Sequence, residues 1–202
     1  MPELRIVGGQ WRGRRIKVPP GHVRPTADRV REAWISIVLP ALDGARVVDL
    51  CAGSGALGLE ALSRGAAHGR GLLDEIAMRR VLAENIATLG AGERATVHGG
   101  SALKAIDEFA GAEAVAGGAA ETARSAALVT EMPWEVAFAD PPYNEGQAVA
   151  LAERWLRAPF AAIFGVEHES SITLPPHADG REPDRRRYGI TALTFYRLNG
   201  TS

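Results

Sequence analysis

The chain has 202 residues, of which 46% are hydrophobic and 23% are charged, and its formal net charge is −1. This composition is typical of a soluble globular protein, and the length is sufficient for one large domain with a substantial core. The single cysteine, Cys51, excludes an intramolecular disulfide, and no stretch reaches the roughly 20 apolar residues of a membrane helix. One cysteine and five scattered histidines do not have metal-ligand spacing. We therefore expect a cytoplasmic protein, monomeric and without a metal centre.

Basic residues are concentrated near the N-terminus. Residues 1–31 contain eight basic and two acidic residues, a net charge of +6, so the rest of the chain carries −7. This asymmetry indicates a binding surface for a polyanion, although a solvated basic tail has the same composition. The candidate nucleic-acid contacts are Trp11, Arg12, Arg14, Arg15, Lys17, Arg24 and Arg29.

The first predicted elements are a small hairpin and a helix. Residues 4–7 and 14–18 alternate apolar and polar side chains on either side of a glycine pair, which predicts a basic β-hairpin within an extension over residues 1–23. Thr26 is a suitable N-cap for a helix that runs to about Leu39. Trp34 lies on the apolar face of this helix, so we assign it to the core.

The main domain, residues 24–202, begins its sheet with a strand over residues 46–51. A glycine-rich turn and a helix to Ser63 follow this strand. This combination forms a cradle for a nucleotide-type ligand, because glycines admit a ligand close to the backbone and a helix start presents unpaired N–H groups. About twenty residues later, Asp74 ends a second predicted strand with a carboxylate suited to ribose hydroxyls. The candidate cofactor contacts in this part are Asp49, Ala52, Gly53, Ser54, Gly55 and Asp74.

Two kinds of cofactor fit this pattern. The glycines at 53, 55 and 58 together with Asp74 match a dinucleotide fingerprint, so a nicotinamide or flavin enzyme is a competing interpretation. Asp49, four residues before the first glycine, favours a cationic sulfonium with a free amino group over a pyrophosphate. A hydride-transfer enzyme also usually needs a substrate domain for which this chain has no room. S-Adenosylmethionine is therefore the better fit.

Asp140-Pro141-Pro142-Tyr143 is the candidate catalytic motif. It ends the apolar run 136–139, a predicted buried strand, and ligands bind at the carboxyl ends of strands in open α/β sheets. The Asp140 side chain and the Pro141 carbonyl are adjacent acceptors that match the two hydrogens of an exocyclic amino group. Tyr143 can stack on the ring that carries this group. The alternative is a Pro-Pro turn with a solvated aspartate.

The remaining segments complete an alternating pattern of strands and helices. Helices are predicted over residues 76–89 and 147–157, and strands over 95–98, 161–166 and 190–196, the last as a closing antiparallel strand. The small-residue segment 111–132 is a predicted insertion. A loop around Pro175-Pro176-His177 leads to residues 185–189, to which the pattern assigns no strand. The pattern predicts an α/β, Rossmann-like, doubly wound and mostly parallel sheet.

Four segments together resemble the bacterial 16S rRNA (guanine-N2) methyltransferases of the RsmD type: residues 6–14, 24–32, 49–65 and 140–143. The resemblance spans nearly the whole chain apart from 111–132, and the basic hairpin followed by Arg24-Pro25-Thr26 is its specific part. It implies a class I fold with seven strands, S-adenosylmethionine as cofactor, and a guanine in 16S rRNA, position 966 in the family, presented on the assembling small ribosomal subunit.

The same resemblance implies roles for individual residues. Asp49, Gly53 and Gly55 would line the methionine side of the cofactor, and Asp74 would hold the ribose. Ser101 and Ala102 would contact adenine, and Thr26 would join the cofactor site. The chain departs from the family where Ser101 replaces an Asp or Asn. It also departs where Asp74 and Glu75 are adjacent instead of separated by one residue, so either of them is a candidate for the ribose.

Three alternative functions remain open. Methylation of an adenine amino group in DNA would use the same four-residue motif, but the chain has little room for a target-recognition domain. Cytosine C5 methylation needs a thiolate, and Cys51 is better interpreted as a buried small hydrophobic residue. A non-catalytic RNA-binding module that keeps a relic pocket is the alternative from another class, and the complete Asp140–Tyr143 motif argues against it.

Overall fold

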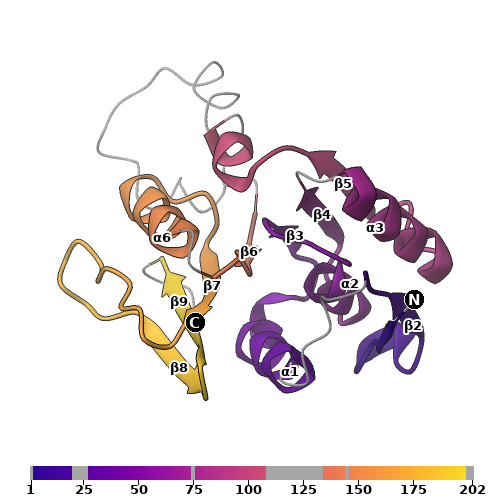
Figure 1. Ribbon diagram of the computed structural model, residues 1–202, viewed down its shortest axis with the longest axis horizontal. Coiled ribbons are helices and arrows are strands. Elements are labelled where there is room, and N and C mark those ends of the chain that lie inside the picture. The colour runs from indigo at the N-terminus through magenta and orange to yellow at the C-terminus, as the bar shows by residue number, and fades with distance from the viewer. Residues whose placement is uncertain (1, 20–26, 74–75, 108–133, 144–145, 199–202) are drawn as a thin grey trace.

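The structure is a computed structural model that describes residues 2–19, 27–73, 76–107, 134–143 and 146–198 (Figure 1). Several predicted features lie outside these residues. They are the candidate site residues Arg24, Thr26, Asp74 and Glu75, and the predicted insertion over residues 111–132. No helix among the described residues has the length and apolar character needed to cross a membrane.

A seven-stranded sheet with the order β5-β4-β3-β6-β7-β9-β8 forms the centre of the molecule. The first five strands in this order run parallel, whereas β9 is antiparallel to both of its neighbours. The strands are β3 (Arg46–Asp49), β4 (His68–Leu73), β5 (Ala95–Gly99), β6 (Val136–Ala139), β7 (Ile163–Glu169), β8 (Asp184–Tyr188) and β9 (Thr191–Arg197). This sheet confirms the predicted Rossmann-like fold. The strand order reverses between β3 and β6, and ligands bind at such a switch point.

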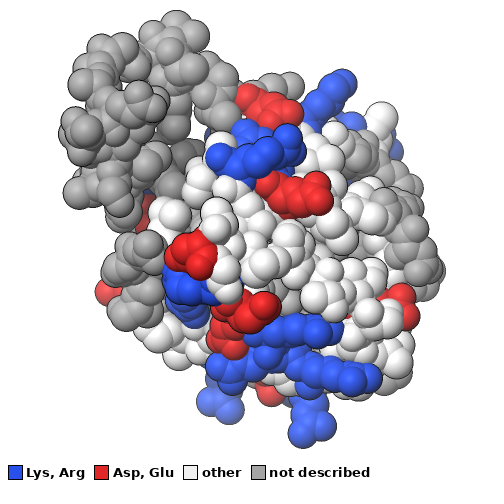
Figure 2. All heavy atoms as spheres, turned by 90° about the vertical axis from the view of Figure 1, so that its left-hand side faces the viewer, with Lys and Arg blue, Asp and Glu red and all other residues white. Residues whose placement is uncertain are grey.

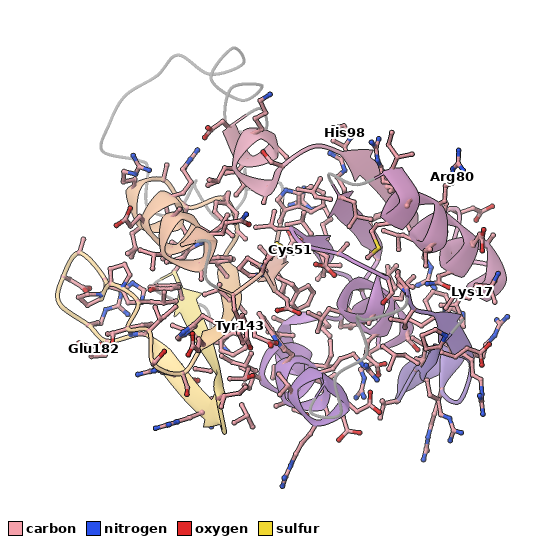
Figure 3. The ribbon with its side chains drawn as sticks, viewed as in Figure 1. Lys17, Cys51, Arg80, His98, Tyr143 and Glu182 are labelled. Carbon is pink, nitrogen blue, oxygen red and sulfur yellow. The ribbon has the colours of Figure 1, made fainter. Side chains whose placement is uncertain are left out.

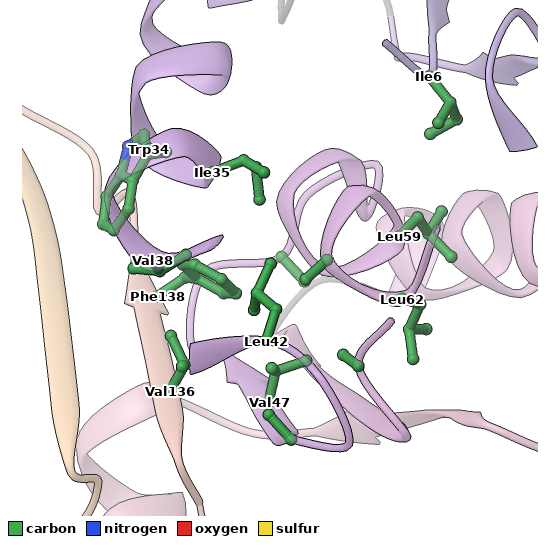
Figure 4. Close-up of a cluster of buried hydrophobic side chains, with 14 of the residues drawn as sticks. Ile6, Trp34, Ile35, Val38, Leu42, Val47, Leu59, Leu62, Val136 and Phe138 are labelled. Atoms are coloured by element: carbon green, nitrogen blue, oxygen red, sulfur yellow. The ribbon is translucent and has the colours of Figure 1, made fainter. Parts of the chain in front are cut away.

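Helices cover both faces of the sheet (Figure 1). One face packs against α1 (Ala27–Val38), α2 (Ala56–Ser63) and α3 (Ile76–Leu89), and the other packs against α6 (Gln147–Arg157) and a helical segment over residues 102–107. Trp34 of α1 is 1% exposed and meets Phe138 and Phe195 edge-on at centroid distances of 5.6 and 5.1 Å. Figure 4 shows Trp34 of α1 and Phe138 of β6 within the cluster of buried side chains. The prediction that Trp34 is a core residue is confirmed.

The N-terminal hairpin is present as β1 (Glu3–Arg5) and β2 (Arg15–Lys17), with a 3-10 turn over Gly9–Trp11 between them. Glu60 of α2 attaches it to the main domain: its buried carboxylate accepts the N–H groups of Val7 and Gly8 at 2.9 and 2.8 Å. Charge-assisted bonds of this kind are stronger than neutral ones. The hairpin is therefore packed on α2 as part of one core with the main domain.

One strand differs from the sequence prediction. Residues 184–188, to which the sequence pattern assigned no strand, form the edge strand β8, which pairs only with β9 among the described strands. Three consecutive arginines lack the apolar alternation that identifies a half-buried strand. An edge strand does not need that alternation, because one of its sides faces solvent and charges there oppose pairing with another chain.

Candidate active site

A cavity of about 640 Å³ opens at the carboxyl ends of β3, β4 and β6. The hairpin contributes Leu4 and Val18 to its wall, and α1 contributes Val30, Arg31 and Trp34. The structure brings together here most of the described candidates for cofactor binding and catalysis: Asp49, Ala52, Gly53, Ser54, Ser101, Ala102, Asp140, Pro141 and Pro142. These nine candidates come from three separate segments of the sequence, residues 49–54, 101–102 and 140–142, and share one cavity.

Asp49 ends β3 with a carboxyl group that is almost completely buried, at 3% exposure. Burial raises the pKa of this group to about 7, and hydrogen bonds from the backbone N–H groups of Cys51 and Gly58 oppose the rise. Gly58 lies in the first turn of α2, where N–H groups lack partners within the helix. In the described part of the chain Asp49 forms no ion pair, so its negative charge is compensated only by dipoles.

The glycine loop between β3 and α2 is held from behind by α3. Asn85 is buried, and its Nδ2 donates to the Ser54 carbonyl at 2.8 Å. Gly55 has a φ of 84°, and a Cβ atom there would lie 2.3 Å from Leu82 of α3. Only glycine suits this position, because the backbone is left-handed and the helix is close. Gly55 does not line the cavity, so its direct effect is on the packing of the loop, not on contact with a ligand.

The catalytic candidates follow β6, whose four residues are all buried. Asp49 of β3 is level with Phe138, so Asp140 emerges two residues beyond it on the neighbouring strand. The Asp140 side chain is exposed to solvent at the cavity wall, whereas Pro141 is buried. The two prolines cannot donate to a sheet ladder, which explains why pairing stops here.

Tyr143 is fixed through its hydroxyl group and does not itself line the cavity. The hydroxyl donates to Glu167 Oε1 at 2.9 Å and lies 2.8 Å from Thr191 Oγ1, and both partner residues do line the cavity. Burial and the nearby carboxylates of Glu167 and Asp140 raise the pKa of Tyr143 to about 12. The tyrosine therefore remains protonated at neutral pH and ties the end of the motif to β7 and β9.

Sequence reasoning missed four polar residues of the cavity wall: Arg31, Gln147, Glu167 and Thr191. Glu167 lies just beyond residue 166, where the fifth strand was predicted to end, but β7 continues to Glu169. An acidic residue close to the carboxyl end of a buried strand was the available signal. Arg31 is buried at 6% exposure and forms an ion pair with Asp28 at 3.1 Å. The only sequence signal that its side chain points toward the cavity was its position three residues before Trp34 on the same helix.

The described candidates for nucleic-acid contact fall into three groups. Trp11 is 6% exposed with the Arg94 guanidinium 5.1 Å from its ring centroid, so the expectation of an exposed stacking surface is wrong for this residue. It is buried because it belongs to the packed core beneath the hairpin. The other described candidates are exposed. The side chains of Arg14, Arg15 and Lys17 have intramolecular partners, whereas the side chains of Arg12 and Arg29 form no hydrogen bond or ion pair with another described residue.

Cys51 also differs from expectation. It was predicted to be a buried small hydrophobic residue, but it is only partly buried: it packs against the core and also lines the cavity near Asp49. β3 ends at Asp49, so Cys51 lies in the turn beyond the strand, where its side chain is at the edge of the core and of the cavity. Figure 3 shows Cys51 and Tyr143 near the middle of the molecule and Lys17 on the hairpin at its margin.

Comparison with known proteins identifies the family. A family model described as conserved hypothetical protein 95 matches residues 4–197. The Escherichia coli K12 protein named ribosomal RNA small subunit methyltransferase D is 38% identical over 180 residues, which cover 86% of this chain and 78% of that protein. A solved E. coli structure described as a candidate methyltransferase, yhhF, is 32% identical with a TM-score of 0.75 and covers 99% of this chain and 100% of its own.

A more distant structure shares the fold alone. It is a T. thermophilus 16S rRNA N2 guanine methyltransferase in complex with AdoMet and guanosine, 18% identical, with a TM-score of 0.63 over 98% of this chain and 50% of that one. The whole-chain family match and the 38% identity carry the assignment. The chain therefore belongs to the ribosomal RNA small subunit methyltransferase D family of S-adenosylmethionine-dependent methyltransferases.

Proposed function

We propose that this chain transfers a methyl group from S-adenosylmethionine to the exocyclic N2 amino group of one guanine in 16S rRNA, the position 966 guanine of the family. One observation carries the proposal. The motif after β6 and the glycine loop after β3 line the same cavity, so an amino group held by the motif and a cofactor held by the loop would meet there. The family assignment supports ribosomal RNA as the substrate class.

The cavity has features that fit the cofactor. Asp49 is a buried carboxyl group without a cationic partner in the described part of the chain, and a cofactor with a sulfonium and an ammonium group would provide one. A pyrophosphate would add negative charge to the same place, which argues against a dinucleotide. Ala52, Gly53 and Ser54 have small side chains that leave the loop backbone accessible. Ser101 and Ala102 would form the opposite wall for the adenine.

The mechanism assigns separate roles to the motif residues. Bound S-adenosylmethionine supplies an activated methyl group on a good leaving group. The Asp140 carboxylate and the Pro141 carbonyl accept the two hydrogens of the guanine amino group, which turns its nitrogen lone pair toward the methyl carbon for in-line attack. With the cofactor held by the glycine loop, the nitrogen–carbon bond would form as the sulfur–carbon bond of the methyl donor breaks. The surplus proton on nitrogen then passes to solvent through the exposed Asp140 carboxylate.

The target base must leave its stack to enter the cavity. Tyr143 does not line the cavity itself, but its hydroxyl is held by Glu167 and Thr191, which do, so it fixes the end of the motif beside the cavity wall. Its ring is our candidate to stack on the extruded guanine from this position. Exposed basic side chains of the hairpin and α1, such as Arg12 and Arg29, would bind phosphates of the surrounding RNA.

The direct test is to incubate the protein with methyl-labelled S-adenosylmethionine and unmodified small ribosomal subunits or naked 16S rRNA, and then to identify the labelled nucleoside. We expect N2-methylguanosine at a single site. Label on adenine or cytosine would contradict the guanine assignment. Cofactor binding without label in either RNA would favour the non-catalytic module.

A further inference from the structure

The β8–β9 hairpin is a second basic surface, separate from the N-terminal one. Residues 181–188 contain four arginines and two acidic residues. Three of the arginines are consecutive on β8, at the edge of the sheet, and all three are exposed. Figure 2 shows basic side chains gathered at the lower margin of the face that contains this edge of the sheet, with acidic ones among them.

Two of the four arginines are neutralised locally. Arg181 forms an ion pair with Asp179 at 2.7 Å, and Arg186 forms one with Asp184 at 2.8 Å. Exposed pairs of this kind leave little net charge for a partner to use. The acidic side chains within the patch therefore include the partners of these two arginines, Asp179 and Asp184.

The other two arginines keep their charge. The Arg185 guanidinium donates to the carbonyls of Ser170 and Ile172 at 2.8 and 3.2 Å, and that of Arg187 donates to the carbonyl of Gly189 at 3.2 Å. Neither arginine has an ion-pair partner in the part of the chain that the structure describes. Carbonyl groups orient a guanidinium group without neutralising it, and an arginine has further N–H donors for a phosphate.

These two cations lie on one side of the strand. Arg185 is opposite Thr194, and Arg187 is opposite Ala192 on β9. Side chains alternate along a strand, so the two share a face at a separation of about 7 Å, and the ion-paired Arg186 points to the other face. A row of like charges results, and it matches a repeating anion better than a single carboxylate.

The tip of the hairpin adjoins the cavity. Tyr188 pairs with Thr191, which lines the cavity and contacts the Tyr143 hydroxyl. The two residues of the turn between them are Gly189, whose φ of 65° favours glycine, and Ile190, which is 76% exposed. An exposed isoleucine one residue from the cavity wall offers an apolar contact beside the entrance.

We propose that the β8–β9 hairpin is a second RNA-binding element, in which Arg185 and Arg187 bind phosphates next to the target nucleotide and Ile190 packs against a base or ribose at the gap left by the extruded guanine. This inference rests on the proposed RNA methyltransferase function. Charged residues on an edge strand can also serve only to prevent pairing with a strand of another chain. In that case Arg186, which is ion-paired, and its two neighbours would have the same role, and replacing any of them should have the same effect on RNA binding. The difference between the two kinds of arginine is what an experiment can measure.

The test compares Arg185→Gln/Arg187→Gln with the matched control Arg186→Gln. For each protein we would measure the affinity for unmodified 16S rRNA at several salt concentrations, and the affinity for S-adenosylmethionine. Loss of two phosphate contacts is expected to weaken RNA binding on the order of tenfold and to reduce the slope of log K against log salt by about 1.5. The control should stay within about twofold, and cofactor affinity should not change in either variant.

Two further variants sharpen the test. Arg185→Lys/Arg187→Lys keeps both charges and should retain the salt slope, and Ile190→Ser should weaken RNA binding without changing the slope. If the double glutamine variant binds RNA with the wild-type affinity and slope, the inference is wrong while the proposed function stands. If the wild-type protein transfers no methyl group to RNA, the proposed function fails and this inference fails with it.

Discussion

Asn85 connects the cofactor loop to the N-terminal hairpin. Its Nδ2 donates to the carbonyl of Ser54 at 2.8 Å and to the carbonyl of Lys17 at 2.9 Å, while its Oδ1 accepts the Lys17 N–H at 2.8 Å. One buried amide therefore holds the backbone of β2 and the backbone of the glycine loop at the same time. The hairpin is thereby coupled to the geometry of the cofactor site.

Replacement of this amide should affect both stability and cofactor binding. In Asn85→Leu, the Ser54 carbonyl and both Lys17 backbone groups lose their partner, and we expect a loss of about 2–4 kcal/mol in the free energy of unfolding. S-Adenosylmethionine affinity should also fall at a temperature where the variant remains folded. Urea unfolding and calorimetric titration measure the two effects. Thr88→Ala, an exposed change on the same helix, is the control, and equal behaviour of the two variants would contradict the coupling.

Asp49 predicts a pH dependence of cofactor binding. Its pKa is raised from 3.8 to about 7 because burial disfavours the carboxylate. The cationic groups of the cofactor favour the ionised form, so binding releases a proton and affinity should increase as the pH rises from 6 to 8. The increase approaches about tenfold per pH unit below the pKa. Titrations across this range with Asp49→Asn as control test the prediction, because the variant should show a flat profile.

The same shift has a consequence for the stability of the cofactor-free protein. The folded pKa lies above the unfolded value, so the contribution of Asp49 to stability is complete below about pH 4 and is lost as the pH rises through about 7. Asp49→Asn should therefore be more stable than the wild type at pH 8, and the two should converge near pH 4. Denaturant unfolding at both pH values provides the measurement, and a constant difference would exclude this assignment.

The Tyr143 hydroxyl is predicted to position the motif without proton transfer. In Tyr143→Phe the contacts to Glu167 and Thr191 are lost, and we expect a stability loss of about 1 kcal/mol and a lower kcat with little change in the KM for RNA. Tyr143→Ala should raise that KM as well, because the ring is also lost. Since the tyrosine pKa is about 12, the wild-type rate should show no tyrosine-dependent inflection below pH 10, and an inflection that Tyr143→Phe removes would argue against a positioning role.

The fold was largely predictable from the sequence because its signals are local. The buried run 136–139 and the alternation at 190–196 correspond to β6 and β9, and the apolar spacing around Trp34 corresponds to the buried face of α1. β8 was not predictable in this way. Its three consecutive arginines do not alternate with apolar residues. Its strand conformation depends on pairing with β9, and the local sequence does not indicate that pairing.

The candidate site was predicted where function depends on backbone motifs and missed where it depends on packing. Asp49, at the end of β3, and Asp140, directly after β6, were named as candidates because each is followed by a turn rich in glycine or proline, and the structure places both on the cavity wall. Glu167 was missed because its role comes from contact with Tyr143 and Trp34, 24 and 133 residues away in the sequence. Trp11 was misassigned because the local sequence, a tryptophan next to an arginine, is the same whether the tryptophan is exposed or buried.

The most direct test of the central claim is the single-turnover rate of methyl transfer by Asp140→Ala, measured with 16S rRNA under saturating labelled S-adenosylmethionine. Cofactor affinity is measured on the same protein. The account predicts that the rate falls on the order of a hundredfold or more while cofactor affinity stays near that of the wild type, because Asp140 acts on the amino group and not on the cofactor. A variant that keeps the wild-type rate with the cofactor bound would show that the motif after β6 does not hold the reacting nitrogen.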